Sequence, residues 1–246
     1  GSRLLRGRGP APAAQGAAPG SAGRQLVEAT GAKMPAAYLQ PRRAWAAMLL
    51  YWACGALCAL RYRGMLGAGP PSVAGPLSGA VYGSAALATL LCAGTYAKGS
   101  LRLGRRWNPA VSAVFALLNG TCETALFLTA FDVGWSSAPG SALSAGLLGY
   151  ASFLVYSAAV HILFWEPCVF PPHIAAGEPK RRKVLKICLL AAASSSWLLC
   201  YKVYGDVVTP CVLHALLNFV GDWSICMPPP WAGYSYAASA GEAAVR

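Results

Sequence analysis

Asn119-Gly-Thr-Cys-Glu-Thr-Ala-Leu-Phe-Leu-Thr-Ala-Phe131 is the second half of an apolar run that begins near Pro109 and carries one acidic side chain, Glu123. An ionisable side chain inside a membrane span is costly, so it normally faces the bundle interior, pairs with another polar group and marks a functional site. His214-Ala-Leu-Leu-Asn218 supplies the obvious partners. Positions 119 and 123, like 214 and 218, are four residues apart and share a helix face. We therefore expect Glu123 to meet His214.

The composition indicates an integral membrane protein. Of the 246 residues, 56% are hydrophobic and 11% are charged, whereas soluble domains carry about 25% charged residues. Six apolar segments are long enough, or nearly so, to cross a bilayer, which takes about 20 residues. They run approximately over 44–60, 77–97, 109–131, 142–165, 184–204 and 207–220, and the first and last are short. The last of them contains Pro210, and it has the alternative of continuing the fifth as one bent helix. We predict an all-α, polytopic transmembrane helical bundle of about six spans.

The basic residues support six alternating spans. The formal charge is +12, from 20 Lys and Arg against 8 Asp and Glu. If the spans alternate, one side of the membrane receives only Arg61, Arg63 and Lys202. The other side receives Arg42, Arg43, Lys98, Arg102, Arg105, Arg106, Lys180, Arg181, Arg182, Lys183 and Lys186. This asymmetry predicts that both termini lie on the basic side. Nucleic-acid binding is disfavoured because no basic stripe with interleaved aromatic residues occurs.

The two ends of the chain differ from its apolar body. Residues 1–36 are rich in Ala, Gly, Pro and Arg and poor in acids, which is typical of an organellar transit peptide, with a plain disordered tail as the alternative. Residues 227–246 begin with a proline run and are also expected to be disordered. The transmembrane domain is therefore expected over 37–226.

The nine cysteines predict neither a metal site nor a disulfide framework. Their number is odd, most of them lie in apolar runs, and no C-x-x-C motif occurs. We interpret them as reduced packing residues. The sequence also contains no H-E-x-x-H motif.

The order of the polar residues resembles a known family. Glu123, then His161 in the next span, then His214-x-x-x-Asn218 after one intervening span, is similar to the order in CAAX-protease and bacteriocin-processing intramembrane enzymes. That family has the motifs Glu-Glu-x-x-x-Arg, Phe-x-x-x-His and His-x-x-x-Asn. The likeness covers about residues 109–222. It implies a metal-independent endopeptidase site in which Glu123 is the general base that activates water, while His214 and Asn218 donate hydrogen bonds to the oxyanion.

Three positions depart from the family pattern. Cys122 stands where the family has the first glutamate, Phe127 where it has the arginine, and Ser157 where it has the phenylalanine. The second carboxylate and a cationic partner for Glu123 are therefore missing. These departures favour a catalytically degenerate member, in which Glu123 ties helices together.

His161 is the least well placed of the four candidates. At about 1.5 Å per residue it falls about 12 Å from the middle of its span toward the basic side, whereas Glu123 is displaced toward the opposite side. We expect the two to lie apart unless the helices tilt strongly or the span boundaries shift.

Three classes of function stay open. The first is a degenerate membrane scaffold or assembly factor, and Phe127-Leu-Thr-Ala-Phe131-Asp-Val-Gly134 resembles the plastid CAAX-protease-like branch, which implies a thylakoid location and partners among pigment-protein or pigment-synthesis complexes. The second is an active intramembrane endopeptidase. The third is a pigment-associated subunit, with His161 as a ligand of a chlorophyll magnesium; the other two classes require no cofactor. In every case the lipid bilayer is a partner.

Overall fold

The computed structural model of the chain describes residues 41–68, 76–101, 109–169 and 180–225, and within them every element is a helix. The expected leader, 1–36, and the expected tail, 227–246, lie outside these ranges. The elements are α2 (Pro41–Arg61), α3 (Arg63–Ala68), α4 (Pro76–Leu101), α5 (Pro109–Ser137), α6 (Ala142–Val160), the π-helix η1 (His161–Val169), α8 (Lys180–Tyr204) and α9 (Val208–Ile225). The prediction of a helical protein is confirmed for the part of the chain that the structure describes.

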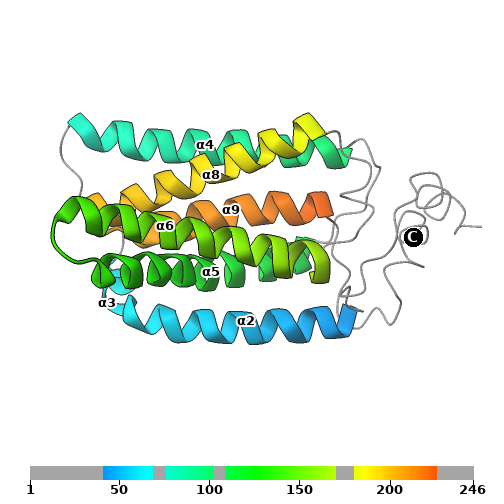
Figure 1. Ribbon diagram of the computed structural model, residues 1–246. Helices are drawn as coiled ribbons and strands as arrows, with labels where there is room; N and C mark the ends of the chain where they lie inside the picture. Colours follow the sequence, from blue (N-terminus) through cyan, green and yellow to red (C-terminus); the bar gives the residue numbers. More distant parts are fainter. Residues whose placement is uncertain (1–40, 69–75, 102–108, 170–179, 226–246) are drawn as a thin grey trace, which may run out of the picture.

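Five of these helices are long and apolar enough to cross a membrane. The candidate spans are Arg43–Arg61, Leu77–Ala97, Pro109–Ser137, Ala142–Trp165 and Arg181–Tyr204, and a shorter apolar helix covers Val208–Gly221. The alternative of one bent helix over the last two segments is wrong, because α8 and α9 run in opposite directions (Figure 1). The chain reverses at Gly205, whose positive φ of 66° suits a residue without a Cβ.

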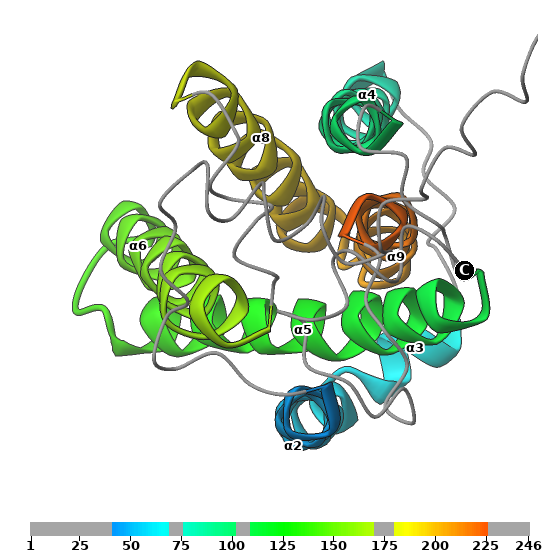
Figure 2. The same cartoon turned by 90° about the vertical axis from the view of Figure 1, so that its right-hand side faces the viewer.

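α5 is the central helix of the bundle. Of its span, 67% is buried, against at most 33% for the other four candidate spans. It packs against α2, α6 and α9, which surround it in Figure 2. Two glycines allow this close approach: a Cβ on Gly55 would lie 2.5 Å from the Cys122 carbonyl oxygen, and a Cβ on Gly120 would lie 2.7 Å from the Ala215 backbone. Glu123 is therefore carried by the most buried of the five candidate spans.

Successive long helices alternate in direction, so the start of α2 and the end of α9 lie at the same end of the bundle (Figure 1). Among the described side chains, that end carries Arg43 and the basic cluster at 181–186, whereas Arg61 and Lys202 lie at the other. The segregation of basic residues predicted from the sequence is thus present in the described helices. Which end faces which compartment stays a prediction.

The depth of α9 is fixed by its first turn. The Asp206 carboxylate accepts a hydrogen bond from the Thr209 backbone N–H at 3.0 Å, which satisfies one of the free N–H groups at the helix start. The Tyr82 hydroxyl of α4 donates to the same carboxylate at 2.9 Å. This anchor sets the level at which His214 enters the bundle.

Candidate functional site around Glu123

Glu123 lies at the centre of the bundle. The third span was expected to end at Phe131, but α5 continues to Ser137, so the midpoint of Pro109–Ser137 is residue 123. The residue is 2% exposed. A carboxylate at this depth requires hydrogen-bond partners from the protein.

Four side chains contact the carboxylate. The Tyr51 hydroxyl of α2 and the indole N–H of Trp165 in η1 donate to Oε1 at 2.8 and 2.7 Å. The Asn119 amide, one turn earlier on α5, donates to Oε2 at 2.6 Å. His214 Nε2 of α9 lies 3.4 Å from Oε2. Glu123 therefore joins α2, α5, η1 and α9, and the expected meeting with His214 is confirmed.

A second layer of contacts holds these partners in place. The Trp52 indole N–H donates to Asn119 Oδ1 at 2.8 Å, so the Asn119 amide nitrogen faces Glu123. His214 Nδ1 pairs with the Thr124 hydroxyl at 2.9 Å. The rings of Trp197 and Phe127 stack on the imidazole, with centroids 4.9 and 6.0 Å away. Phe127, which stands where the resembled family has an arginine, thus packs against the histidine and supplies no cation.

The expectation that His161 lies apart from Glu123 is wrong. His161 lines the same cavity as Glu123, and its ring centroid is 6.5 Å from that of Phe127. Two features explain the error: α5 extends beyond its expected end and crosses the bundle at a strong tilt (Figure 2), and η1 begins at His161 itself. A π-helical turn places side chains differently from an α-helix and often occurs at functional sites.

The tautomer of His161 follows from one hydrogen bond. Its Nδ1 lies 2.7 Å from the Ser157 carbonyl oxygen, which can only accept, so Nδ1 carries the proton. In the neutral ring Nε2 is then an acceptor or base. It makes no hydrogen bond with the described residues. Nε2 is also the nitrogen left for a chlorophyll magnesium, a role that stays a prediction.

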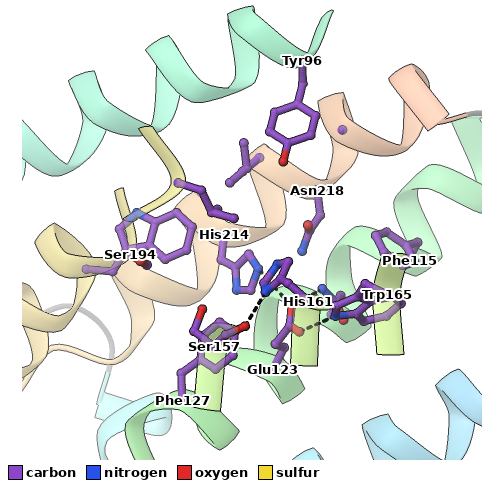
Figure 3. A pocket seen from close by; sticks show the side chains of 15 residues that line it. Tyr96, Phe115, Glu123, Phe127, Ser157, His161, Trp165, Ser194, His214 and Asn218 are labelled. Atoms are coloured by element: carbon purple, nitrogen blue, oxygen red, sulfur yellow. Dashed lines mark hydrogen bonds and ion pairs between the residues drawn. The ribbon is translucent and has the colours of Figure 1, made fainter. Parts of the chain in front are cut away.

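The four candidate residues meet at one cavity of about 60 Å³. Figure 3 shows Glu123, His161, His214 and Asn218 converging from α5, η1 and α9. The Asn218 side chain points toward His161, and its Nδ2 is buried without a hydrogen-bond partner among the described residues. The remaining lining residues are Tyr96, Phe115, Asn119, Phe127, Ser157, Trp165, Leu190, Ser194, Trp197, Leu217 and Gly221.

The described residues contain no group of three or more His, Cys, Asp or Glu side chains placed to hold a metal ion. The cysteines whose side chains the structure describes are all free. Cys92, Cys122, Cys200 and Cys211 are buried, as expected of packing residues. Cys54 and Cys188 are exposed, so the packing interpretation is wrong for these two; they face outward from apolar helices.

Several residues of the site were not predicted. Tyr51, Trp52 and Trp165 supply hydroxyl and indole donors around Glu123, and Trp197 stacks on His214. The available signal was chemical: each is an aromatic residue with a polar atom inside an apolar segment, and such an atom needs a buried partner. Among the hydrogen-bond donors to Glu123, spacing along one helix revealed Asn119.

The chain matches no protein-family model, no curated protein and no solved structure. The likeness to CAAX-type enzymes therefore stays a prediction that depends on the order of the polar residues.

Proposed function

We propose that this chain is a catalytically degenerate, CAAX-protease-like membrane protein that acts as a scaffold or assembly factor. The observation that supports the proposal is that four side chains contact the Glu123 carboxylate. An ionised carboxylate has about four lone-pair sites, and four side-chain nitrogens and oxygens contact it: Tyr51, Trp165, Asn119 and His214. A general base needs a lone pair directed at water. Glu123 uses its lone pairs to join helices.

The aromatic contact at Phe127 supports the same function. An arginine at this position would offer Glu123 a cation, whereas Phe127 stacks on His214 and packs against Phe153 at a centroid distance of 5.8 Å. The ring contributes to packing around the histidine. The site is thereby organised for rigidity.

An active endopeptidase is the second candidate, and one specific observation favours it. His161, His214 and Asn218 converge on the cavity beside Glu123, and the Asn218 amide nitrogen is a buried donor without a partner in the part of the chain that the structure describes. In this mechanism Glu123 and the adjacent His161 would activate water, and Asn218 would donate to the oxyanion. The mechanism requires one of the four contacts to Glu123 to open.

Rescue of cells that lack the protein separates the two functions. The His161→Ala and Asn218→Leu variants remove cavity groups that do not hold Glu123, so a scaffold retains full rescue with both. An endopeptidase loses rescue with both, although the variants accumulate normally in the membrane. Purified protein that cleaves a prenylated or membrane-embedded peptide in a His161-dependent manner would also contradict the scaffold function.

We further propose a thylakoid location, with partners in pigment-protein or pigment-synthesis complexes. The support is the Arg-rich, acid-poor composition of residues 1–36 and the likeness of residues 127–134 to the plastid branch. A reporter fused to residues 1–36 should enter plastids, and the full chain should fractionate with thylakoids. A reporter that stays in the cytosol would contradict the plastid location and leave the scaffold function standing.

A further inference from the structure

The cavity beside Glu123 contains hydrogen-bonding capacity that the described residues do not use. Asn218 Nδ2 is a buried donor without a partner among the described residues. A buried polar group in this state costs free energy, and such groups are rare unless something else satisfies them. His161 Nε2, in the neutral ring, adds an acceptor. The cavity is thus complementary to a group that both accepts and donates.

The size and charge of the cavity restrict this group further. At about 15 Å³ per water-sized group, the cavity of about 60 Å³ holds roughly four such groups. The Glu123 carboxylate on its wall disfavours an anion. A free fatty acid or a phosphate is therefore a poor fit, and a small neutral amide head fits: its carbonyl accepts from Asn218 and its N–H donates to His161.

The surroundings indicate that the amide belongs to a lipid-like molecule. Ser157 and His161 form one wall of the cavity, while Leu190 and Ser194 of α8 form another. α6 and α8 are not among the helix pairs that pack extensively, and they diverge in Figure 2. Among the described residues, the side-chain hydrogen bond that joins them is Tyr150 Oη to Ser195 Oγ at 2.8 Å.

The outer faces of these two helices are apolar. Val155 of α6, Ile162 of η1 and Ile187 of α8 are 69%, 63% and 65% exposed. In helices of this length and hydropathy, exposed aliphatic side chains face acyl chains. A molecule that reaches the cavity between α6 and α8 must therefore carry an apolar chain.

We propose that the cavity binds the head of a neutral single-chain fatty acyl amide, which enters between α6 and α8. Asn218 Nδ2 donates to its carbonyl oxygen, and His161 Nε2 accepts from its amide N–H. No covalent step is involved. The inference goes beyond the scaffold function and is independent of it, since it depends on Asn218 and His161 and leaves the four contacts to Glu123 unchanged.

Photolabelling of the purified full chain in nanodiscs tests the proposal. The probe is palmitamide with a diazirine in the acyl chain and a terminal alkyne, and the comparison probe is palmitic acid with the same chain. We expect unlabelled palmitamide to compete for the labelling, and the labelled peptides to come from α6 and α8. The acid probe should label the protein at least about ten-fold more weakly than the amide probe, because its charge faces Glu123.

Variants connect the labelling to the two polar groups. Asn218→Leu should weaken competition by palmitamide about five-fold, which corresponds to one hydrogen bond between uncharged groups. Because it removes an unpartnered donor, it should leave the melting temperature unchanged or raised. His161→Phe keeps an aromatic ring, lacks the acceptor and should also weaken competition; it provides the same test if Asn218→Leu fails to fold. Val212→Leu, on the exposed face of α9, is the matched control.

Equal labelling by the two probes, or labelling that is unaffected by both Asn218→Leu and His161→Phe, would overturn the proposal. Uniform labelling of all helices would do the same, because it would indicate ordinary lipid contact. These outcomes are separate from the rescue experiment: a scaffold that binds no amide would still rescue with His161→Ala and Asn218→Leu.

Discussion

Glu123 and Asp132 are two buried carboxylates on the same helix, nine residues apart, and they differ in what surrounds them. Asp132 accepts from the Tyr62 hydroxyl at 3.0 Å and from the Tyr201 hydroxyl at 2.9 Å, and Arg61 lies 3.4 Å away. Arg61 is 58% exposed, so this cluster reaches the surface. Glu123 is 2% exposed and borders a cavity whose Asn218 donor has no partner among the described side chains and backbone. Two hydrogen-bonded acids thus have different surroundings: one fastens an end of the bundle, and the other forms part of the wall of an internal cavity.

The largest effect is expected at Glu123. Glu123→Leu removes the acceptor of three hydrogen bonds and the partner of His214. Breaking a buried pair by removing one partner costs about 3–5 kcal/mol, and we expect a fall in the free energy of unfolding of that size, measured by denaturation in mixed micelles. A loss below about 1 kcal/mol would mean that Glu123 does not join the four elements.

Close packing at the level of Glu123 is tested by Gly120→Ala. The new Cβ would lie 2.7 Å from the Ala215 backbone of α9, so α5 and α9 must separate. Overpacking of this kind costs about 1–3 kcal/mol. Gly94→Ala is the matched control: it also lies in a long helix, but its Cβ meets nothing within 4 Å. This control should be neutral or stabilising by about 0.5–1 kcal/mol, and equal effects of the two variants would contradict the close contact.

A smaller effect is expected at Asp132. Asp132→Ala leaves the Tyr62 and Tyr201 hydroxyls without their acceptor at the end of the bundle, where water can replace part of the loss. Burial raises the pKa of Tyr62 to about 12, so its hydroxyl remains a donor at neutral pH. We expect a loss of about 1–2 kcal/mol, measured as for Glu123→Leu. If Asp132→Ala lowers the free energy of unfolding as much as Glu123→Leu does, the difference in burial between the two acids does not determine how much each stabilises the fold.

The sequence predicts those features of the fold and of the Glu123 site that lie within a single helix. Hydropathy located all the described long helices, and the spacing of four residues placed Asn119 beside Glu123 and His214 beside Asn218. The depth of His161 relative to Glu123 depends on where α5 ends and on the π-helical turn at η1, and neither leaves a local signal in the hydropathy. The donors Tyr51 and Trp165 come from other elements, so only the packing reveals them.

The smallest effect is expected at the bond that links α6 to α8. Tyr150→Phe removes the hydroxyl that pairs with Ser195 at 2.8 Å. A single hydrogen bond between membrane helices contributes about 0.6 kcal/mol, so the melting temperature should barely change. The rate of photolabelling by the palmitamide probe should nevertheless rise, because α6 and α8 are then free to separate beside the cavity.

Ser195→Ala removes the other half of the same bond and should raise the labelling rate equally, and the double variant should add nothing to either single change. Ser137→Ala is the control, since its hydroxyl donates within α5, to the Val133 carbonyl oxygen. Unchanged rates in both bond variants would show that the ligand reaches the cavity by another route. Faster labelling that persists with Asn218→Leu would mean that acyl chains enter between α6 and α8 whatever their head group. The cavity beside Glu123 would then select no ligand, and Glu123 and Asp132 would differ only in how deeply they are buried.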